Sequence, residues 1–309
     1  MRYEVIKVKP DELEVDIVKQ LSFWANPDLL KVYSKRENLP LFYLCVIKNT
    51  RVIATMPFFE KKKMGITYVY QLRMHFYTPI DFFIREEASL FYLHNERIWI
   101  LQSLAHYLKK KYLIAEMKIE CTTSDMRGFL WSGFTAEPLY TYKKVITEYN
   151  RSELPKISRR QLKKANENSL RVTEHWDINI IKKLLSELVK RKQLSEVLTS
   201  NNYLDFYEVL NDLGYCSNIV VFNDNEPVAF RLVLTDPKKV YSCELIAGAS
   251  SNGNDLRANF LCLDYIFKLL HEYYIFDFCG ANIESIAYFK SQFNCELINY
   301  YKIKKKYLT

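Results

Sequence analysis

Near its C-terminus the chain reads Ser291-Gln292-Phe293-Asn294-Cys295-Glu296-Leu297-Ile298, and its first half carries a copy of this stretch, Ser132-Gly133-Phe134-Thr135-Ala136-Glu137-Pro138-Leu139. Ser, Phe and Glu match in register, and the Tyr-Lys pairs at 142–143 and 301–302 continue the match. Each copy follows a helical pattern and then a short strand that ends in cysteine. We infer that one α/β unit has been duplicated.

A second match supports the duplication. Residues 46–54 and 221–229 both read as strand, turn, strand, with Asn or Asp at matching turn positions. Extra strand-like sequence over 65–84 lengthens the first copy. Each unit then reads helix, β-hairpin, strand, helix, strand, short helix and final strand. This order predicts an α+β fold of two tandem domains, 1–150 and 151–309, each a mixed and mostly antiparallel sheet flanked by helices, with one parallel strand pair.

The second half shows the pattern more clearly. Its periodicity predicts helices over 178–192, 201–213, 258–273 and 283–293, and strands over 219–222, 228–235, 240–247, 275–279 and 297–303.

The composition favours some classes of ligand and excludes others. The 309 residues are 49% hydrophobic and carry a net charge of +8, so the chain can bury a core and favours anionic partners. Only 7 residues are glycine, and neither Gly-x-Gly-x-x-Gly nor Gly-Lys-Ser/Thr occurs, which excludes the common Gly-rich nucleotide loops. Three of the seven, Gly248, Gly253 and Gly280, fall near the ends of two predicted neighbouring strands.

The seven cysteines are scattered and the five histidines are isolated from them. The chain begins without a signal-type apolar run and contains no transmembrane-length apolar stretch. We therefore expect a cytoplasmic protein without a transmembrane segment, a metal site or a tightly bound cofactor.

Four stretches carry a resemblance to a known family. They are Leu154 to Ala165, Gly248-Ala249-Ser250 with Leu256 to Asn259, Phe276 to Asn282, and Tyr288 to Asn294 followed by Tyr300 to Ile303. In order and spacing, the chain resembles the FemAB-like branch of the GNAT acyltransferase superfamily, whose members carry two GNAT folds in tandem. The resemblance covers most of residues 140–305, and the first half is similar in architecture alone.

The resemblance implies an N-acyltransferase that moves an acyl or aminoacyl group from acyl-CoA or aminoacyl-tRNA to an amine. It also implies an anionic donor or a phosphate-bearing acceptor, with tRNA a candidate partner. Direct transfer needs no covalent nucleophile, and the sequence offers no Ser-His-Asp or Cys-His constellation. The donor groove is expected in the C-terminal domain, between the strands near Glu244 and Asp277.

Three residues are candidates for catalysis. Lys290 lies on a predicted helix with apolar neighbours, and the resemblance implies that it stabilises charge during transfer; the alternative is a solvated surface lysine. Asp277 interrupts an apolar strand, as a proton acceptor or, the reading we favour, as a helix cap or the partner of a basic residue. The same two readings, proton acceptor or structural partner, apply to Glu244.

The loop before the helix predicted from Leu256 is the candidate site for a donor phosphate. The candidates are Ser250, Asn252 and Gly253 in the loop, with Arg257 and Asn259 at the start of the helix that follows. Acetyl-CoA users of the superfamily often show Gln/Arg-x-x-Gly-x-Gly/Ala here, whereas this loop has one glycine and the acidic Asp255. The alternative is a capped helix start, with Asp255 as N-cap and Arg257 solvated.

A basic stripe is the candidate polyanion-binding site. Arg159, Arg160, Lys163 and Lys164 recur at helical spacing, so they share a face that suits a phosphate backbone or pyrophosphate. The alternative is an ordinary solvated face. The stripe also supports a rival function, a non-catalytic module that binds tRNA or another polyanion.

Overall fold

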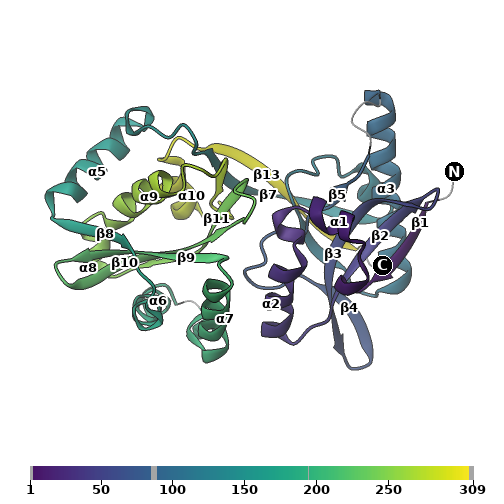
Figure 1. Ribbon diagram of the computed structural model, residues 1–309, viewed down its shortest axis with the longest axis horizontal. Coiled ribbons are helices and arrows are strands. Elements are labelled where there is room, and N and C mark those ends of the chain that lie inside the picture. The colour runs from purple at the N-terminus through teal and green to yellow at the C-terminus, as the bar shows by residue number, and fades with distance from the viewer. Residues whose placement is uncertain (1–2, 85–88, 194, 306–309) are drawn as a thin grey trace. The chain divides into compact units, whose positions relative to one another are not determined.

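The computed structural model describes residues 3–84, 89–193 and 195–305 (Figure 1). Its chain forms two compact units, unit 1 with Met1–Leu139 and Asn299–Thr309, and unit 2 with Tyr140–Ile298. The divisions fall inside two long strands, β7 (Phe134–Val145) and β13 (Glu296–Lys305). The predicted domain boundary at residue 150 falls after the first of these divisions, and the last residues of the chain belong to unit 1.

Unit 1 is built on a sheet of order β1-β2-β3-β4, with β5 paired to β3, and on the path β6-β13-β7. A parallel bridge between Val69 and Ala115 joins β4 to β6. The long helix α3 supplies the apolar side chains Ile100, Leu101, Leu104 and Leu108 to the core against this sheet. The strands are β1 (Glu4–Val8), β2 (Leu41–Lys48), β3 (Arg51–Lys63), β4 (Ile66–Tyr70), β5 (Asp81–Phe82) and β6 (Glu116–Ile119). The helices are η1 (Pro10–Glu12), α1 (Val15–Gln20), η2 (Phe23–Ala25), α2 (Pro27–Glu37), α3 (Leu90–Lys111) and α4 (Arg127–Trp131).

Unit 2 contains a sheet with the path β7-β12-β11-β10-β9-β8. Its pairs are antiparallel except β11 with β12, which is the predicted parallel pair. Figure 1 shows α5, α9 and α10 on one face of this sheet and α6 and α7 on the other. The strands are β8 (Leu170–Glu174), β9 (Cys216–Asn223), β10 (Glu226–Thr235), β11 (Tyr241–Ala249) and β12 (Ile275–Asp277). The helices are η3 (Arg151–Glu153), α5 (Lys156–Glu167), α6 (Ile178–Lys192), η4 (Glu196–Thr199), α7 (Asn201–Asp212), α8 (Ser251–Asp255), α9 (Ala258–Leu269) and α10 (Glu284–Ser291).

The two halves of the chain repeat one order of elements, as the duplicated sequence predicts. Helix, hairpin, strand, helix, strand, short helix and final strand are α2, β2–β3, β4, α3, β6, α4 and β7 in one half. In the other they are α7, β9–β10, β11, α9, β12, α10 and β13. Even the hairpin turns correspond, because Asn49 and Asp224 both take positive φ, of 49° and 52°. Asn and Asp tolerate this left-handed conformation better than most residues.

Candidate active site

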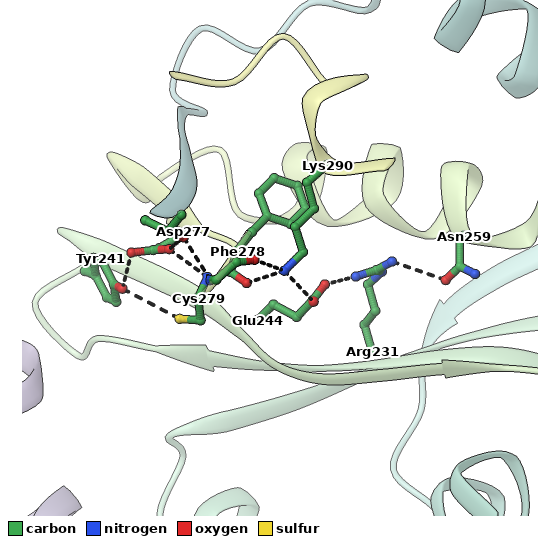
Figure 2. A network of polar contacts seen from close by, with 10 residues as sticks. Arg231, Tyr241, Glu244, Asn259, Asp277, Phe278, Cys279 and Lys290 are labelled. Carbon is green, nitrogen blue, oxygen red and sulfur yellow. Dashed lines mark hydrogen bonds and ion pairs between the residues drawn. The ribbon is translucent and has the colours of Figure 1, made fainter. Parts of the chain in front are cut away.

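The candidate site lies in unit 2, where two parallel strands stop pairing. β11 pairs with β12 only from Tyr241 to Cys243, because β12 ends at Asp277 while β11 continues to Ala249. Side chains from α10 and β10 fill the space beyond the last pair (Figure 2). The sequence-predicted residues Lys290, Glu244 and Asp277 come together here.

Lys290 is buried, not solvated as in the alternative considered above. Its side chain reaches from α10 to the turn after β12, where its Nζ donates to the carbonyl oxygens of Phe278 and Gly280, each at 2.7 Å. Cys279 between them has a φ of 52°, which lets both flanking carbonyls face one atom. Burial lowers the pKa of Lys290 from 10.5 to about 8, and the Arg231 guanidinium adds to this effect.

Arg231 is a member of the site that sequence reasoning missed. It lies on β10, is 3% exposed, and ion-pairs with Oε2 of Glu244. Its Nη2 donates to Oδ1 of Asn259 at 3.2 Å (Figure 2). Its guanidinium lies over the Phe289 ring. Burial lowers the pKa of Arg231 to about 10, so it stays charged at neutral pH. The sequence did carry a signal for Arg231, because it is a lone charge inside an apolar strand, the same feature that singled out Asp277.

Glu244 joins the two cations. One carboxylate oxygen pairs with Arg231, and the other lies 3.6 Å from Nζ of Lys290, beyond normal hydrogen-bond length. A protonated lysine has three N–H donors. Two of those on Lys290 are committed to backbone carbonyls, and the third faces Glu244 without a hydrogen bond.

Asp277 has a full set of partners. It is completely buried, and its Oδ1 accepts from Thr141 Oγ1 and from the Cys279 backbone N–H, both at 2.7 Å. Its Oδ2 accepts from the Tyr241 hydroxyl at 2.9 Å and lies 3.4 Å from Lys143 Nζ. Both oxygens are engaged, which favours the reading of Asp277 as the partner of a basic residue. The carboxylate anchors the turn whose carbonyls hold Lys290.

The loop from Ser250 forms a capped helical turn. Ser250 is the N-cap of α8, and its Oγ accepts from the Gly253 N–H at 3.0 Å. The alternative reading of Asp255 as N-cap is therefore wrong, whereas the helix predicted from residue 258 does begin there. Asp255 ends α8, and α9 begins at Ala258. Ser250 opens a separate short helix, α8, and Asp255 is the last residue of that helix rather than the start of the next one.

The predicted phosphate-binding residues of this loop are dispersed. Asn252 is exposed on α8, and Arg257, at a φ of 64°, turns its Nη1 to the Asn254 carbonyl. Asn259 points to Arg231 instead. Gly253 packs so closely that an added Cβ would lie 2.1 Å from the Val228 carbonyl oxygen. The glycine serves close helix–strand packing rather than an open loop.

The basic stripe lies on α5. Arg159, Arg160, Lys163 and Lys164 are all exposed, while Ser158, Leu162 and Ala165 on the opposite face are buried. Arg159 and Lys163 also line a cavity of about 420 Å³ together with Arg151. The acidic Glu167 lines the same cavity and lies 4.0 Å from Lys163 Nζ, and Arg151 is paired with Asp264.

A metal cluster and a membrane-spanning helix were searched for in the described parts of the chain. Over residues 3–84, 89–193 and 195–305, no cluster of three or more His, Cys, Asp or Glu side chains could hold a metal ion. In the same residues, no helix has the length and apolar character to cross a membrane.

Comparison with known proteins gives matches in structure alone. No family model matches the chain, and no curated protein matches its sequence. Among solved structures, FemX is similar with a TM-score of 0.66 at 13% identity, over 96% of both chains. L-PGS from Bacillus licheniformis has a TM-score of 0.59 at 14% identity, over 92% of this chain and 93% of that one. A tandem GNAT protein from the clavulanic acid biosynthesis pathway has a TM-score of 0.56 at 12% identity, over 98% of both chains. Identities this low show the fold alone, and that fold is the tandem GNAT-like architecture that the resemblance to the FemAB-like branch predicts.

Proposed function

We propose that this protein is an N-acyltransferase. It moves an acyl or aminoacyl group from an activated donor to an amine, by direct attack and without a covalent enzyme intermediate. The amine nitrogen forms a bond to the donor carbonyl carbon, and negative charge develops on the carbonyl oxygen. As this tetrahedral intermediate collapses, the C–S bond of a thioester or the C–O bond of an aminoacyl ester breaks, and the proton lost by the amine goes to the leaving sulfur or ribose oxygen. The tandem GNAT-like fold supports this class of reaction.

The third N–H of Lys290 is the observation that carries the proposal. It is a buried donor without a hydrogen bond, at the point where β11 and β12 part. Such a donor stabilises charge on a carbonyl oxygen as the tetrahedral intermediate forms, and one oxyanion donor is worth about 3 kcal/mol. Lys290 is thus the proposed catalytic residue. Glu244 and Asp277 are assigned to holding it and its turn in place.

The donor is better matched by aminoacyl-tRNA than by acyl-CoA. The Gly253 N–H of α8 already donates to Ser250 Oγ, so it is not available to a phosphate. Asp255 adds negative charge where a pyrophosphate would bind. The exposed cations of α5 suit a polyanion instead. On this proposal the phosphate contacts of the donor come from Arg159, Arg160, Lys163 and Lys164.

The test compares Lys290→Met with Arg159→Ala/Lys163→Ala. Single-turnover transfer is measured from charged tRNA and from a panel of acyl-CoAs to amine acceptors, with circular dichroism as the folding control. We expect Lys290→Met to lose about a hundredfold in the transfer step with donor affinity retained. The α5 double variant should bind charged tRNA more weakly and with a shallower salt dependence, with the transfer step unchanged at saturating donor.

A second candidate function is a non-catalytic polyanion-binding module. The cavity that Arg159 and Lys163 line with Arg151 favours it. It predicts RNA binding that collapses with the α5 variant and no transfer in any donor and acceptor combination. Transfer that persists at full rate in Lys290→Met would also remove the catalytic assignment of Lys290.

A further inference from the structure

Arg231 competes with Lys290 for one carboxylate. Its guanidinium pairs directly with Oε2 of Glu244, whereas the Lys290 ammonium remains 3.6 Å from Oε1. Arg231 itself is fixed by Asn259 from α9 and by the Phe289 ring from α10. We propose that Arg231 is a positioning residue: by holding Glu244, it keeps the third N–H of Lys290 free for substrate.

The charges of the cluster support this assignment. With Lys290 protonated, Arg231, Glu244 and Lys290 together carry one net positive charge in a buried place. A carboxylate shared unequally between two cations stabilises the nearer one more. If the guanidinium were absent, Glu244 would be drawn to the ammonium and would close the 3.6 Å gap into a hydrogen bond.

Other groups that face Lys290 do not replace this competition. Asp277 on β12 is engaged by Lys143, Tyr241, Thr141 and the Cys279 amide. The Cys279 thiol on the turn is uncharged at neutral pH, since burial raises its pKa well above the ordinary value. The ion pair between Arg231 and Glu244 is thus the contact that decides how firmly the third donor is held.

The catalytic consequence of this inference rests on the proposed function. The effect of Arg231 on Lys290 can be measured without substrate. Lysine labelled with ¹³C at Cε reports the protonation of Lys290 by NMR, with the resonance assigned by its loss in Lys290→Met. In Arg231→Gln, Glu244 pairs with Lys290 alone, and we expect the pKa of Lys290 to rise by about one unit or more. In Glu244→Gln the ammonium loses its carboxylate, and its pKa should fall below that of the wild type.

These opposite signs separate the proposal from simple loosening of the core, which would expose Lys290 and raise its pKa in both variants. Arg231→Lys keeps a cation and should stay close to the wild-type titration. The double variant Arg231→Gln/Glu244→Gln removes the competing pair, and its Lys290 should titrate below Arg231→Gln. An unchanged Lys290 titration in Arg231→Gln, or an upward shift in Glu244→Gln, overturns the inference.

The transfer assay supplies the catalytic arm. In Arg231→Gln we expect kcat to fall about tenfold or more with little change in KM, because the captured N–H no longer reaches the developing oxyanion. Arg231→Lys should restore most of that loss. If the NMR shifts appear but the wild-type protein transfers nothing, the proposed function fails while the role of Arg231 in holding Glu244 stands. If the shifts appear and Arg231→Gln transfers at the wild-type rate, the catalytic consequence is wrong.

Discussion

The Nζ atom of Lys290 lies 2.7 Å from the carbonyl oxygen of Gly280, a residue whose φ of 132° is open to glycine but not to L side chains. The glycine therefore aims a backbone acceptor at the proposed catalytic lysine. An added Cβ would meet no heavy atom within 4 Å, so any effect of a side chain here comes from the backbone alone.

Gly280→Ala should therefore misplace this carbonyl. We expect a loss of about 1–3 kcal/mol in the free energy of unfolding, from the forced φ, and a drop in transfer rate larger than stability alone explains. Gly214→Ala is the matched control, because Gly214 has a φ of 72° and equally open space but lies outside the site. Urea unfolding and single-turnover transfer are measured on both. An equal effect of the two changes on transfer would contradict the assignment.

Transfer should also depend on pH in a defined direction. A neutral lysine keeps only two N–H donors, and the Phe278 and Gly280 carbonyls take both. Burial lowers the pKa of Lys290 to about 8, so we expect the transfer step to slow as pH rises through 8, even though the acceptor amine becomes a better nucleophile. The pH profile of single-turnover rates at saturating donor checks this. A rate that climbs steadily from pH 7 to 9.5 would refute the role of the ammonium.

The buried pair of Asp277 and Lys143 should matter for stability. Asp277→Asn keeps the size of the side chain but removes the charge that Lys143, 14% exposed, lies against. We expect a loss of about 3 kcal/mol, since breaking one side of a buried pair strands the other. Glu272→Gln is the control, because its pair with Lys239 is more than half exposed on both sides, and its loss should leave stability nearly unchanged. Chemical denaturation at pH 7 measures both.

The buried cysteines predict an alkaline loss of stability. Burial raises the pKa of Cys45 to about 11 and of Cys262 and Cys295 to about 12, and it raises the pKa of Cys243 as well. Their stabilising effect is complete below the unfolded pKa of about 8.5 and is lost above it, where the unfolded chain ionises first. Each thiol then contributes a slope of about 1.4 kcal/mol per pH unit.

Unfolding free energies at pH 7.5, 9 and 10 test this prediction. Cys262→Ala should reduce the dependence of the unfolding free energy on pH by the contribution of one thiol, about 1.4 kcal/mol per pH unit. The lost packing should also lower stability at every pH. Equal slopes in the variant and the wild type would show that folding does not raise the pKa of Cys262. Slow reaction of these thiols with a maleimide at pH 7.5 is the companion expectation.

For the basic stripe, helical spacing predicted the shared exposed face but not the neighbouring cavity. Arg159, Arg160, Lys163 and Lys164 were predicted on one exposed face, and they lie there because helical geometry depends only on local sequence. The cavity beside Arg159 and Lys163 needed the tertiary structure, since Arg151 comes from a separate turn.

Local pattern also determined the repeated element order and the hairpins with their left-handed Asn49 and Asp224. These follow from periodicity and turn chemistry, which are short-range properties. A lone charge in an apolar strand singled out Asp277, whereas the resemblance to the FemAB-like branch pointed to Lys290 and to a groove near Glu244 and Asp277. The tertiary structure alone decided that Arg231 holds Glu244, that Asn259 faces Arg231, and that β7 and β13 each run through a division between the units. Those facts depend on which strands and helices meet across the sheet. Burial then sets the charge of Lys290, because desolvation is a property of the packed molecule and not of any stretch of sequence.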